Sequence, residues 1–226
     1  MKVFIAHYPK LTQRLQNLVT SLQNNQFDIK NIKVFNGICR SNINKTMFDS
    51  YVESNPKKLR VYFHILREIA PPLTSSNPAF LANFLNHHDI WNTIAKDNDD
   101  FALVLEDDAV ISQSFSKIWP TLIETLPQDL DIAYLNAGCN LTPNLFGVPL
   151  KEGILWYKMP HKRSRTCCSY IISKKCASQL ASITKFALNV DWEMSYHHVI
   201  NNHNVYWTHP CPFVEGSGNV YKSTVR

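Results

Sequence analysis

The chain has 226 residues, a formal net charge of +5, 45% hydrophobic residues and 18% charged residues. This length suits one domain, and the apolar fraction excludes an intrinsically disordered chain. The longest apolar runs cover only a few residues, whereas a bilayer-spanning helix needs about 20, so we expect no transmembrane segment. Only residues 161–165 form a tight basic run, so the clustered cationic face of a nucleic-acid-binding protein is not expected.

The first residues of the chain bear on its compartment. Residues 1–9 contain one positive charge and a short apolar stretch, whereas a secretory signal needs an apolar core of roughly 7–15 residues. We therefore expect a cytoplasmic protein whose six cysteines are reduced thiols. The absence of a Cys-x-x-Cys pair argues against a zinc site, and the six glycines form neither a P-loop nor a dinucleotide-binding fingerprint.

The spacing of apolar residues predicts alternating strands and helices. Apolar runs of about four to eight residues predict strands, and apolar residues three or four positions apart predict helices. In chain order we expect a strand over 2–7, a helix over 11–23, a strand over 32–35, helices over 55–70 and 78–95, a strand over 101–105, a helix over 112–126, strands over 131–135 and 166–173, helices over 174–182 and 191–202, and a strand over 205–208.

These strands are continuous apolar runs, which is typical of strands that are buried on both faces. The sequence therefore predicts a single α/β domain over residues 1–226, with a mainly parallel central sheet and helices on both of its faces. In such folds ligands bind beyond the carboxyl ends of the strands, so the residues that follow each strand are the candidates for a site.

The strongest local signal is a run of three acids, Glu106, Asp107 and Asp108, directly after the strand over 101–105. Adjacent carboxylates repel one another, and a divalent cation such as Mn²⁺ or Mg²⁺ would neutralise them. On an extended chain Glu106 and Asp108 point the same way, so they would flank a metal, while Asp107 would anchor a neighbouring loop or a sugar hydroxyl. The alternative is a solvated acidic turn that caps the next helix.

A site of this kind usually bridges carboxylates to substrate phosphates, and the metal then stabilises the leaving group. The candidate substrates are therefore nucleotide sugars, nucleotides and nucleic acids.

Residues 85–91 together with residues 101–110 resemble glycosyltransferase family 25, which includes lipopolysaccharide β-galactosyltransferases and collagen galactosyltransferases. The family pattern has a Ser-His pair, an aromatic residue four positions later, and a strand that ends in Glu-Asp-Asp. His87 and Trp91 hold the first two of these places, and residues 105–108 keep the third intact. Weaker matches lie near the N-terminus and at residues 166–177, and an aspartate of the family corresponds to Asp191. The chain departs from the pattern at residues 82–83 and at Asn86, where the family has Gly-Cys and Ser.

The resemblance implies a GT-A-like, Rossmann-like fold, a nucleotide-sugar donor, a divalent metal that is usually Mn²⁺, and inversion at the anomeric carbon. The expected reaction moves a galactose-like hexose from a UDP-linked donor to a hydroxyl of a glycan, lipopolysaccharide or protein acceptor. A lipid-linked acceptor would bring the enzyme to the periphery of a membrane.

Each role has candidate residues. We expect Glu106, Asp108 and His209 to bind the metal, and Asp191 or Glu193 to act as the general base. The expected nucleotide-sugar contacts are Tyr8, Arg14, His87, Asp107, Arg163 and Arg165.

Each candidate also has a structural alternative. Asp191 would serve as a helix N-cap, Arg14 as an exposed helical arginine, His87 as a buried histidine with ordinary partners, and His209 as a surface or core histidine. The run over 161–165 would be a solvated loop. The histidines near residues 197–203 do not have the spacing of a recognised metal motif, so we assign them a structural role.

Two other functions use the same carboxylates. A metal-dependent nuclease or phosphodiesterase would need a more basic surface and further acids near the site. A non-catalytic relative would bind a sugar nucleotide or a partner protein, and the intact Glu106-Asp107-Asp108 run argues against it.

Overall fold

The computed structural model describes residues 1–54, 78–138, 148–149, 155–217 and 220–221, and every statement below is confined to them. The strands are β1 Lys2–His7, β2 Ile32–Asn36, β3 Phe101–Glu106, β4 Ala109–Ile111, β5 Ile132–Tyr134, β6 Val148–Pro149, β7 Trp156–Lys158, β8 Ser169–Ser173, β9 Val205–Thr208 and β10 Phe213–Glu215. The helices are α1 Thr12–Asn24, α2 Lys45–Tyr51, α4 Pro78–Ala95, α5 Phe115–Glu124, α6 Lys174–Ala181 and α7 Val190–Ile200, with short 3₁₀ turns η1 Ile29–Asn31 and η2 Arg40–Asn42.

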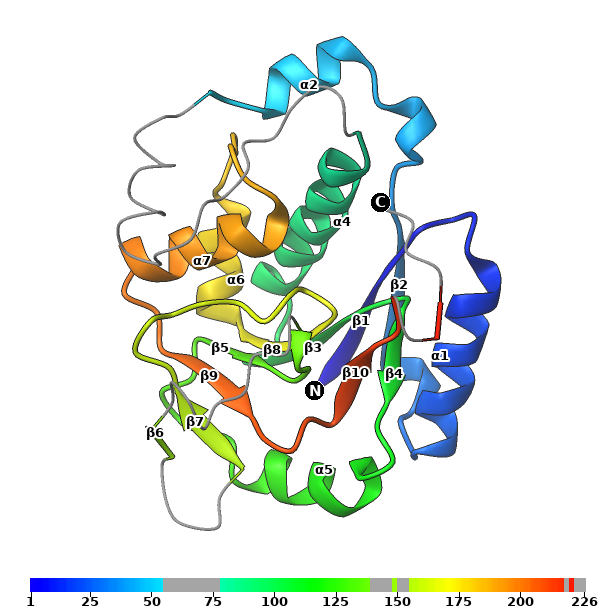
Figure 1. The fold of residues 1–226 in the computed structure, drawn as a ribbon, viewed down its shortest axis with the longest axis vertical. Helices are drawn as coiled ribbons and strands as arrows, with labels where there is room; N and C mark the ends of the chain where they lie inside the picture. The colour runs from blue at the N-terminus through cyan, green and yellow to red at the C-terminus, as the bar shows by residue number, and fades with distance from the viewer. Residues whose placement is uncertain (55–77, 139–147, 150–154, 218–219, 222–226) are drawn as a thin grey trace.

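Eight of these strands form the central sheet, in the order β2-β1-β3-β8-β5-β9-β7-β6 (Figure 1). Strands β8 and β7 run opposite to the other six. The prediction of an α/β fold with a mainly parallel sheet is therefore confirmed. The antiparallel β8 lies between β3 and β5, so the sheet is mixed at its centre.

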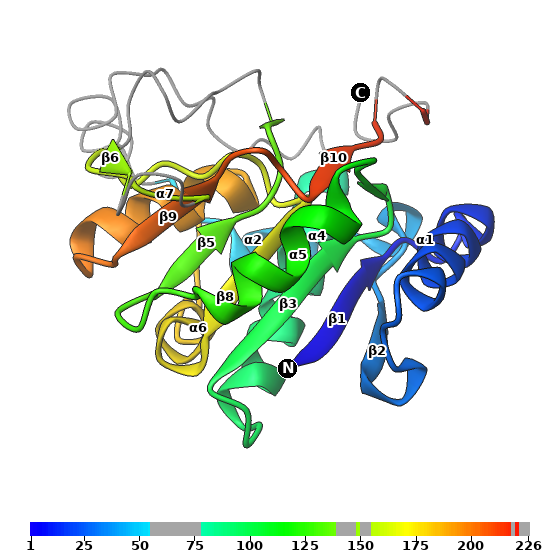
Figure 2. The same ribbon diagram turned by 90° about the horizontal axis from the view of Figure 1, so that it is seen from below.

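Helices cover both faces of the sheet, as predicted (Figure 2). Successive side chains of a strand point to opposite faces, and β1 shows the consequence. Phe4 and Ala6 pack in the apolar cluster that includes α4, α6 and α7. Val3 and Ile5 pack in the second cluster, with α1 and α5. Burial on both faces explains why the strands read as continuous apolar runs.

Most predicted elements are present, and several have the expected ends. Strands β1 and β9 match their predicted ranges. The strand expected over 166–173 begins only at Ser169, because Thr166 has a φ of 71°, which interrupts an extended chain. The helix expected over 55–70 lies outside the described residues. Within the described part of the chain, no helix is both long and apolar enough to cross a membrane.

A small two-stranded sheet attaches the end of the chain to the acidic run. Strand β10 pairs antiparallel with β4, and Glu215 lies opposite Ala109. The backbone N–H of Gly216 then donates to the carbonyl oxygen of Asp108 at 2.9 Å. A Cβ atom at Gly216 would lie 2.5 Å from that oxygen, so only glycine permits this approach. The pairing places residues 215–217 beside the acids that follow β3.

Candidate active site

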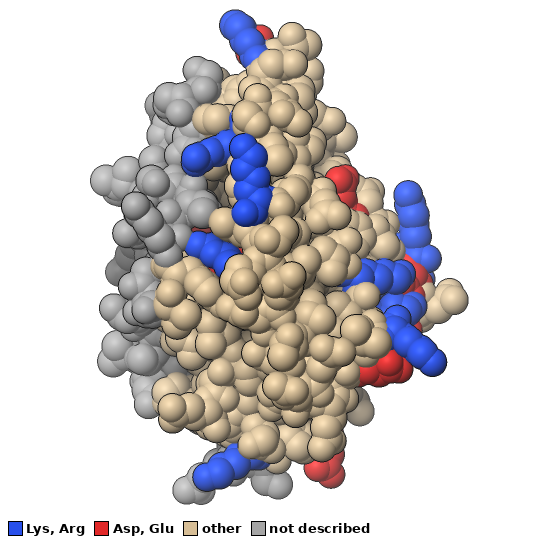
Figure 3. Space-filling view, turned by 90° about the vertical axis from the view of Figure 1, so that its right-hand side faces the viewer, with Lys and Arg blue, Asp and Glu red and all other residues tan. Residues whose placement is uncertain are grey.

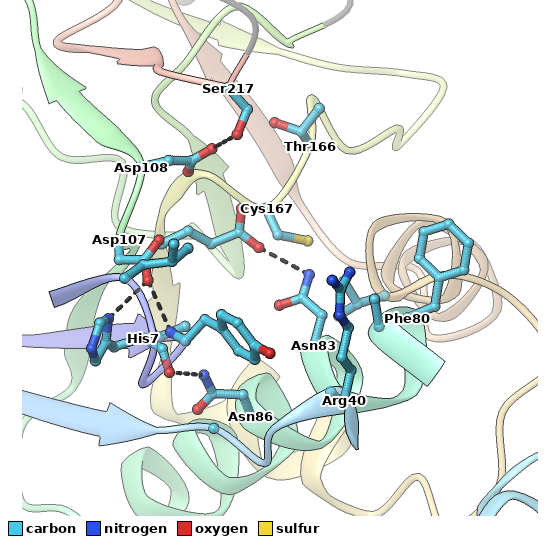
Figure 4. A pocket seen from close by; sticks show the side chains of 18 of the residues that line it. His7, Arg40, Phe80, Asn83, Asn86, Asp107, Asp108, Thr166, Cys167 and Ser217 are labelled. Carbon is cyan, nitrogen blue, oxygen red and sulfur yellow. Dashed lines mark hydrogen bonds and ion pairs between the residues drawn. The ribbon is translucent and has the colours of Figure 1, made fainter. Parts of the chain in front are cut away.

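A pocket of about 410 Å³ opens at the carboxyl ends of β1 and β3. This is the edge at which an α/β sheet binds its ligands. Its walls come from the residues after β1, η2, the first half of α4, the turn after β3, residues 166–167, the start of α7, and the residues around the end of β10. Figure 4 shows Asp107 and Asp108 on one side of the pocket and Arg40 and Phe80 on the other.

Five carboxylates from distant parts of the sequence line this pocket. They are Glu106, Asp107, Asp108, Asp191 and Glu215. Glu106 is the last residue of β3, and Asp107 and Asp108 come directly after it. Asp191 belongs to the first turn of α7, and Glu215 is the last residue of β10. The described arginines of the lining are Arg14 and Arg40. The pocket therefore gathers more acid than base, which favours a bound cation.

Asp108 has the most unusual environment of the five. Its Oδ2 atom accepts a short hydrogen bond from the Ser217 hydroxyl. Its Oδ1 atom is buried and has no hydrogen-bond partner among the described residues. Burial and the neighbouring carboxylates, Glu106 first among them, raise the pKa of Asp108 to about 7. A buried carboxylate oxygen without a partner is costly, and a hard cation would satisfy it.

Two side chains of α4 fix the carboxylate of Glu106 by hydrogen bonds. Its Oε1 atom accepts from Asn83 Nδ2 and from His87 Nε2, both at 3.1 Å. Burial raises the pKa of Glu106, but its bonds with His87 and Asn83 outweigh burial, so the net pKa is below the usual value. The carboxyl is therefore ionised and fixed in direction.

His87 in turn receives support from two aromatic residues. Its Nδ1 atom lies 2.9 Å from the Tyr170 hydroxyl, to which Trp91 Nε1 donates at 3.0 Å. Because the ionised carboxylate of Glu106 can only accept, the neutral His87 ring carries its proton on Nε2, and its Nδ1 atom accepts from the Tyr170 hydroxyl. His87 is 0% exposed and is not among the residues that line the pocket. His87 therefore contacts a carboxylate of the pocket, Glu106, and does not itself line the pocket, where we expected it to contact the donor.

Asp107 anchors the end of β1. Its Oδ2 atom accepts from His7 Nδ1 and from the backbone N–H of Tyr8, both at 2.8 Å, and its Oδ1 atom lies 3.8 Å from Arg14 Nη1. Of the two predicted roles, the structure shows the loop anchor. Tyr8 and Arg14 both line the pocket, as expected for donor contacts. Arg14 is 8% exposed and stacks over the ring of Tyr221, so the alternative of an exposed helical arginine is wrong.

The two candidates for a general base have different environments. Asp191 lines the pocket and is the second residue of α7, so it is not the helix cap. Burial, and then the charge of Glu106, raises the pKa of Asp191 to about 7. Glu193 is 0% exposed, and its Oε2 atom accepts from the backbone N–H groups of Ala187 and Leu188. Glu193 therefore holds the segment before α7, and the structure does not bring it to the pocket.

Three further predicted residues are not among those that line the pocket: His209, Arg163 and Arg165. His209 is exposed, so we leave it out of the metal site proposed below. Arg165 is 1% exposed, donates to the carbonyl oxygen of Thr208 at 3.0 Å and stacks on Trp207. Its neighbour Arg163 is half-buried, and its carbonyl oxygen accepts from Trp207 Nε1. The structure therefore does not bring Arg163 and Arg165 to the pocket, where we expected them to contact the nucleotide sugar.

The pocket also contains polar residues to which the sequence analysis gave no role. They include His7, Arg40, Asn83, Asn86, Thr166, Asn189, Glu215 and Ser217. Asn83 and Asn86 lie three positions apart on α4, and both stand at positions where the chain departs from the family pattern. Asn86 Nδ2 donates to the carbonyl oxygen of His7 at 3.4 Å. Glu215 and Ser217 follow a short apolar run, Phe213-Val214, and this polar end of a strand is the sequence signal that could have identified them.

A model of glycosyltransferase family 25, described as a lipopolysaccharide biosynthesis protein family, matches residues 1–194. The chain belongs to glycosyltransferase family 25. No curated protein sequence matches it.

Several solved structures match the chain at low sequence identity and with TM-scores below 0.5. A UDP-glucose pyrophosphorylase in complex with UDP-glucose matches with a TM-score of 0.44 and 10% identity, over 92% of this chain and 90% of that one. The galactosyltransferase LgtC in complex with donor and acceptor sugar analogues matches with a TM-score of 0.37 and 10% identity, over 91% and 72%. A putative glucose-1-phosphate thymidylyltransferase from Bacillus anthracis matches with a TM-score of 0.39 and 11% identity, over 92% and 85%.

Family membership makes the chain a glycosyltransferase, and its fold is of the α/β class. The family model covers β1, α4, β3, β8 and the start of α7, which together carry most of the pocket. It ends before β10, so Glu215 and Ser217 lie outside the matched residues.

Proposed function

We propose that this family 25 enzyme is a metal-dependent, inverting hexosyltransferase that uses a nucleoside-diphosphate sugar, with UDP as the nucleotide. The observation that carries the proposal is the orphaned Oδ1 atom of Asp108 in a pocket lined by carboxylates. We also propose that the acceptor is a hydroxyl of a glycan, lipopolysaccharide or protein. We further propose a cytoplasmic location. Both proposals follow the expectations from the sequence.

The donor set of the pocket fits a hard divalent cation. Asp108, Glu106 and Glu215 offer only carboxylate oxygens, which Mn²⁺ and Mg²⁺ prefer. Glu215 thus takes the place expected for His209. The ion, when bound, would offset the negative charge that develops on the leaving diphosphate.

The residues beside the acids suit the rest of the donor. Arg14 and Arg40 provide guanidinium groups that match phosphate oxygens. Tyr8 follows β1 and offers an aromatic ring to the nucleobase. Asn83 and Asn86 offer amide groups that hydrogen-bond to sugar hydroxyls.

Asp191 is the group proposed to accept a proton. In an inverting transfer the acceptor oxygen bonds to the anomeric carbon as the bond from that carbon to the diphosphate oxygen breaks. The acceptor proton passes to the Asp191 carboxylate. A base with a pKa of about 7 is well matched to this task near neutral pH.

A surface of scattered charge does not favour the nuclease alternative. Figure 3 shows Lys and Arg side chains at separate points of one face, with Asp and Glu beside several of them. A nucleic-acid interface needs a cationic patch or stripe. On this face the described residues do not form one.

The proposal is tested first by thermal unfolding with UDP, GDP, CDP and their common sugars, each with and without Mn²⁺. A ligand at 100 times its Kd adds about 2.7 kcal/mol to the free energy of unfolding. We expect UDP and UDP-hexoses to raise the unfolding midpoint only when Mn²⁺ is present. If no nucleotide changes the midpoint with any metal, the donor-site assignment is wrong.

Substitution of His87 tests how Glu106 is held. We expect His87→Phe to weaken Mn²⁺ binding about 10–100-fold, because Glu106 loses the donor that fixes its carboxylate. The measurement is a Mn²⁺ titration followed by the electron paramagnetic resonance signal of the free ion. His88→Asn, on the same helix but bonded to the carbonyl oxygen of Ala181, should leave the Mn²⁺ affinity unchanged. Equal affinities for wild type and His87→Phe would contradict the positioning role.

A further inference from the structure

A second group of potential metal ligands lies outside the pocket, between α6, α7 and β9. It consists of Cys176 on α6, His198 on α7, and His203 in the turn before β9. All three are at most 1% exposed, and their ligand atoms lie within 4.8 Å of one another. None of them lines the pocket or serves the proposed transfer reaction.

The inner atoms of this cluster converge on one point. His198 Nδ1 lies 2.9 Å from His203 Nδ1, and Cys176 Sγ lies 3.6 Å from the same His203 atom. Tetrahedral zinc with Zn–S of about 2.3 Å and Zn–N of about 2.0–2.1 Å separates its ligand atoms by about 3.3–3.6 Å. The observed distances therefore need only small side-chain shifts to form one coordination shell.

The outer nitrogens of both rings are held by hydrogen-bond partners. His203 Nε2 lies 2.7 Å from Gln179 Oε1, and His198 Nε2 lies 2.8 Å from the Tyr134 hydroxyl. Metal-bound histidines have this arrangement, because the bond on one ring nitrogen orients the lone pair of the other toward the metal. Gln179 Oε1 can only accept, so His203 carries its proton on Nε2 and leaves Nδ1 free to bind.

Charged side chains also lie near the cluster. The buried carboxylate of Asp131 acts electrostatically on Cys176 and on His203. Asp131 Oδ1 also forms an ion pair with Lys175 Nζ at 3.2 Å, and Lys162 Nζ donates to the carbonyl oxygen of His203 at 2.9 Å. A bound Zn²⁺ with one thiolate carries a net charge of +1, and Asp131 is the negative group beside it.

We propose that Cys176, His198 and His203 bind a structural Zn²⁺ ion that ties α6 and α7 to the start of β9. On binding, the Cys176 thiol loses its proton to solvent, and the thiolate sulfur bonds to the metal. Both imidazoles bind through Nδ1 and keep one proton on Nε2, which His198 donates to the Tyr134 oxygen. The three residues supply three of the four ligands of a tetrahedral zinc ion. Because α7 also carries Asp191, the ion would fix the helix that presents the proposed base.

The competing structure is a metal-free hydrogen-bond network. In it His198 donates its Nδ1 proton to His203 Nδ1 and accepts from Tyr134 at Nε2. The two structures differ in whether sulfur bonds to a metal, so the test must detect that bond.

The experiment adds Co²⁺ to the metal-depleted full chain and records the near-ultraviolet absorption of a cobalt–thiolate bond. We expect this band in the wild type, its displacement by Zn²⁺, and its loss in Cys176→Ala. Cys168→Ala, a buried cysteine outside the cluster, should keep the band. Asp108→Asn should also keep it, which separates this site from the proposed catalytic metal.

Two further measurements keep the test decisive if Cys176→Ala does not fold. Gln179 is only half-buried, and Gln179→Ala should weaken Co²⁺ binding about 10–100-fold without loss of the fold. A zinc chelator should lower the unfolding midpoint of the zinc-loaded wild type. Absence of the cobalt–thiolate band in the folded wild type, or its persistence in Cys176→Ala, would overturn the proposal in favour of the hydrogen-bond network.

Discussion

Asp108→Asn is expected to abolish sugar transfer, with a loss of about 10³-fold or more in kcat/KM. The amide keeps the shape of the side chain but removes the charge that would hold a divalent cation against the diphosphate. The same variant should lose the Mn²⁺-dependent increase in unfolding midpoint that UDP produces in the wild type. Initial rates at saturating Mn²⁺, together with thermal unfolding, measure both effects.

The same substitution should stabilise the metal-free protein at neutral pH. The pKa of Asp108 is about 7 in the folded state and about 3.9 in an unfolded chain. Because the folded pKa is the higher one, the stability that this group contributes is complete below pH 4 and is lost as the pH rises through 7. We expect the free energy of unfolding of Asp108→Asn in a chelator to exceed that of the wild type above pH 7, with the difference shrinking toward pH 4.

The control for both effects is Asp89→Asn, which removes an exposed acid on α4. It should leave the rate, the Mn²⁺ response and the pH dependence of stability unchanged. Retention of the Mn²⁺-dependent UDP effect in Asp108→Asn would show that Asp108 does not hold the metal.

Asp191→Asn is expected to lower kcat about 10²–10⁴-fold while it leaves donor and Mn²⁺ binding intact. The amide cannot accept the acceptor proton, but Asp191 belongs to α7 and is not one of the carboxylates that are proposed to hold the metal. The donor-induced increase in unfolding midpoint should therefore match that of the wild type.

The pH profile separates a base from a structural residue. In the wild type kcat should rise about tenfold per pH unit below pH 7 and then level off, because Asp191 must be ionised to accept a proton. The residual activity of Asp191→Asn should lack this rise. A parallel loss of donor binding and rate, with an unchanged pH profile, would contradict the assignment.

The fold could be read from the sequence because its strands are long apolar runs with polar ends. Residues 2–7 and 101–105 are buried on both faces, so their local composition alone identifies them as central strands. Short elements such as β4, β7 and β10 have only three residues each and show no periodicity. Their existence depends on pairing with distant strands, and local propensity does not encode that pairing.

Some residues of the candidate site could also be identified from the sequence, whereas others depended on packing. Strand-end position and residue type were enough to select Glu106, Asp108 and Tyr8, and all three line the pocket. Arg14, on α1, was selected from the resemblance of the N-terminal segment to the family, and it lines the pocket too. Position alone did not separate Asp191 from Glu193, since both belong to the first turn of α7. Packing decided between them, because it turned Glu193 toward the backbone of residues 187–188.

The sequence by itself therefore determined the α/β class, the family and the acidic end of β3, because each depends on residues that are neighbours in the chain. The tertiary structure alone placed His87 beneath Glu106, brought Glu215 to the acids, and buried Arg165 against Trp207. It also gathered Cys176, His198 and His203, whose spacing along the chain matches no metal motif. These contacts join residues that are far apart in sequence, and side-chain direction there is set by the packing of helices on the sheet.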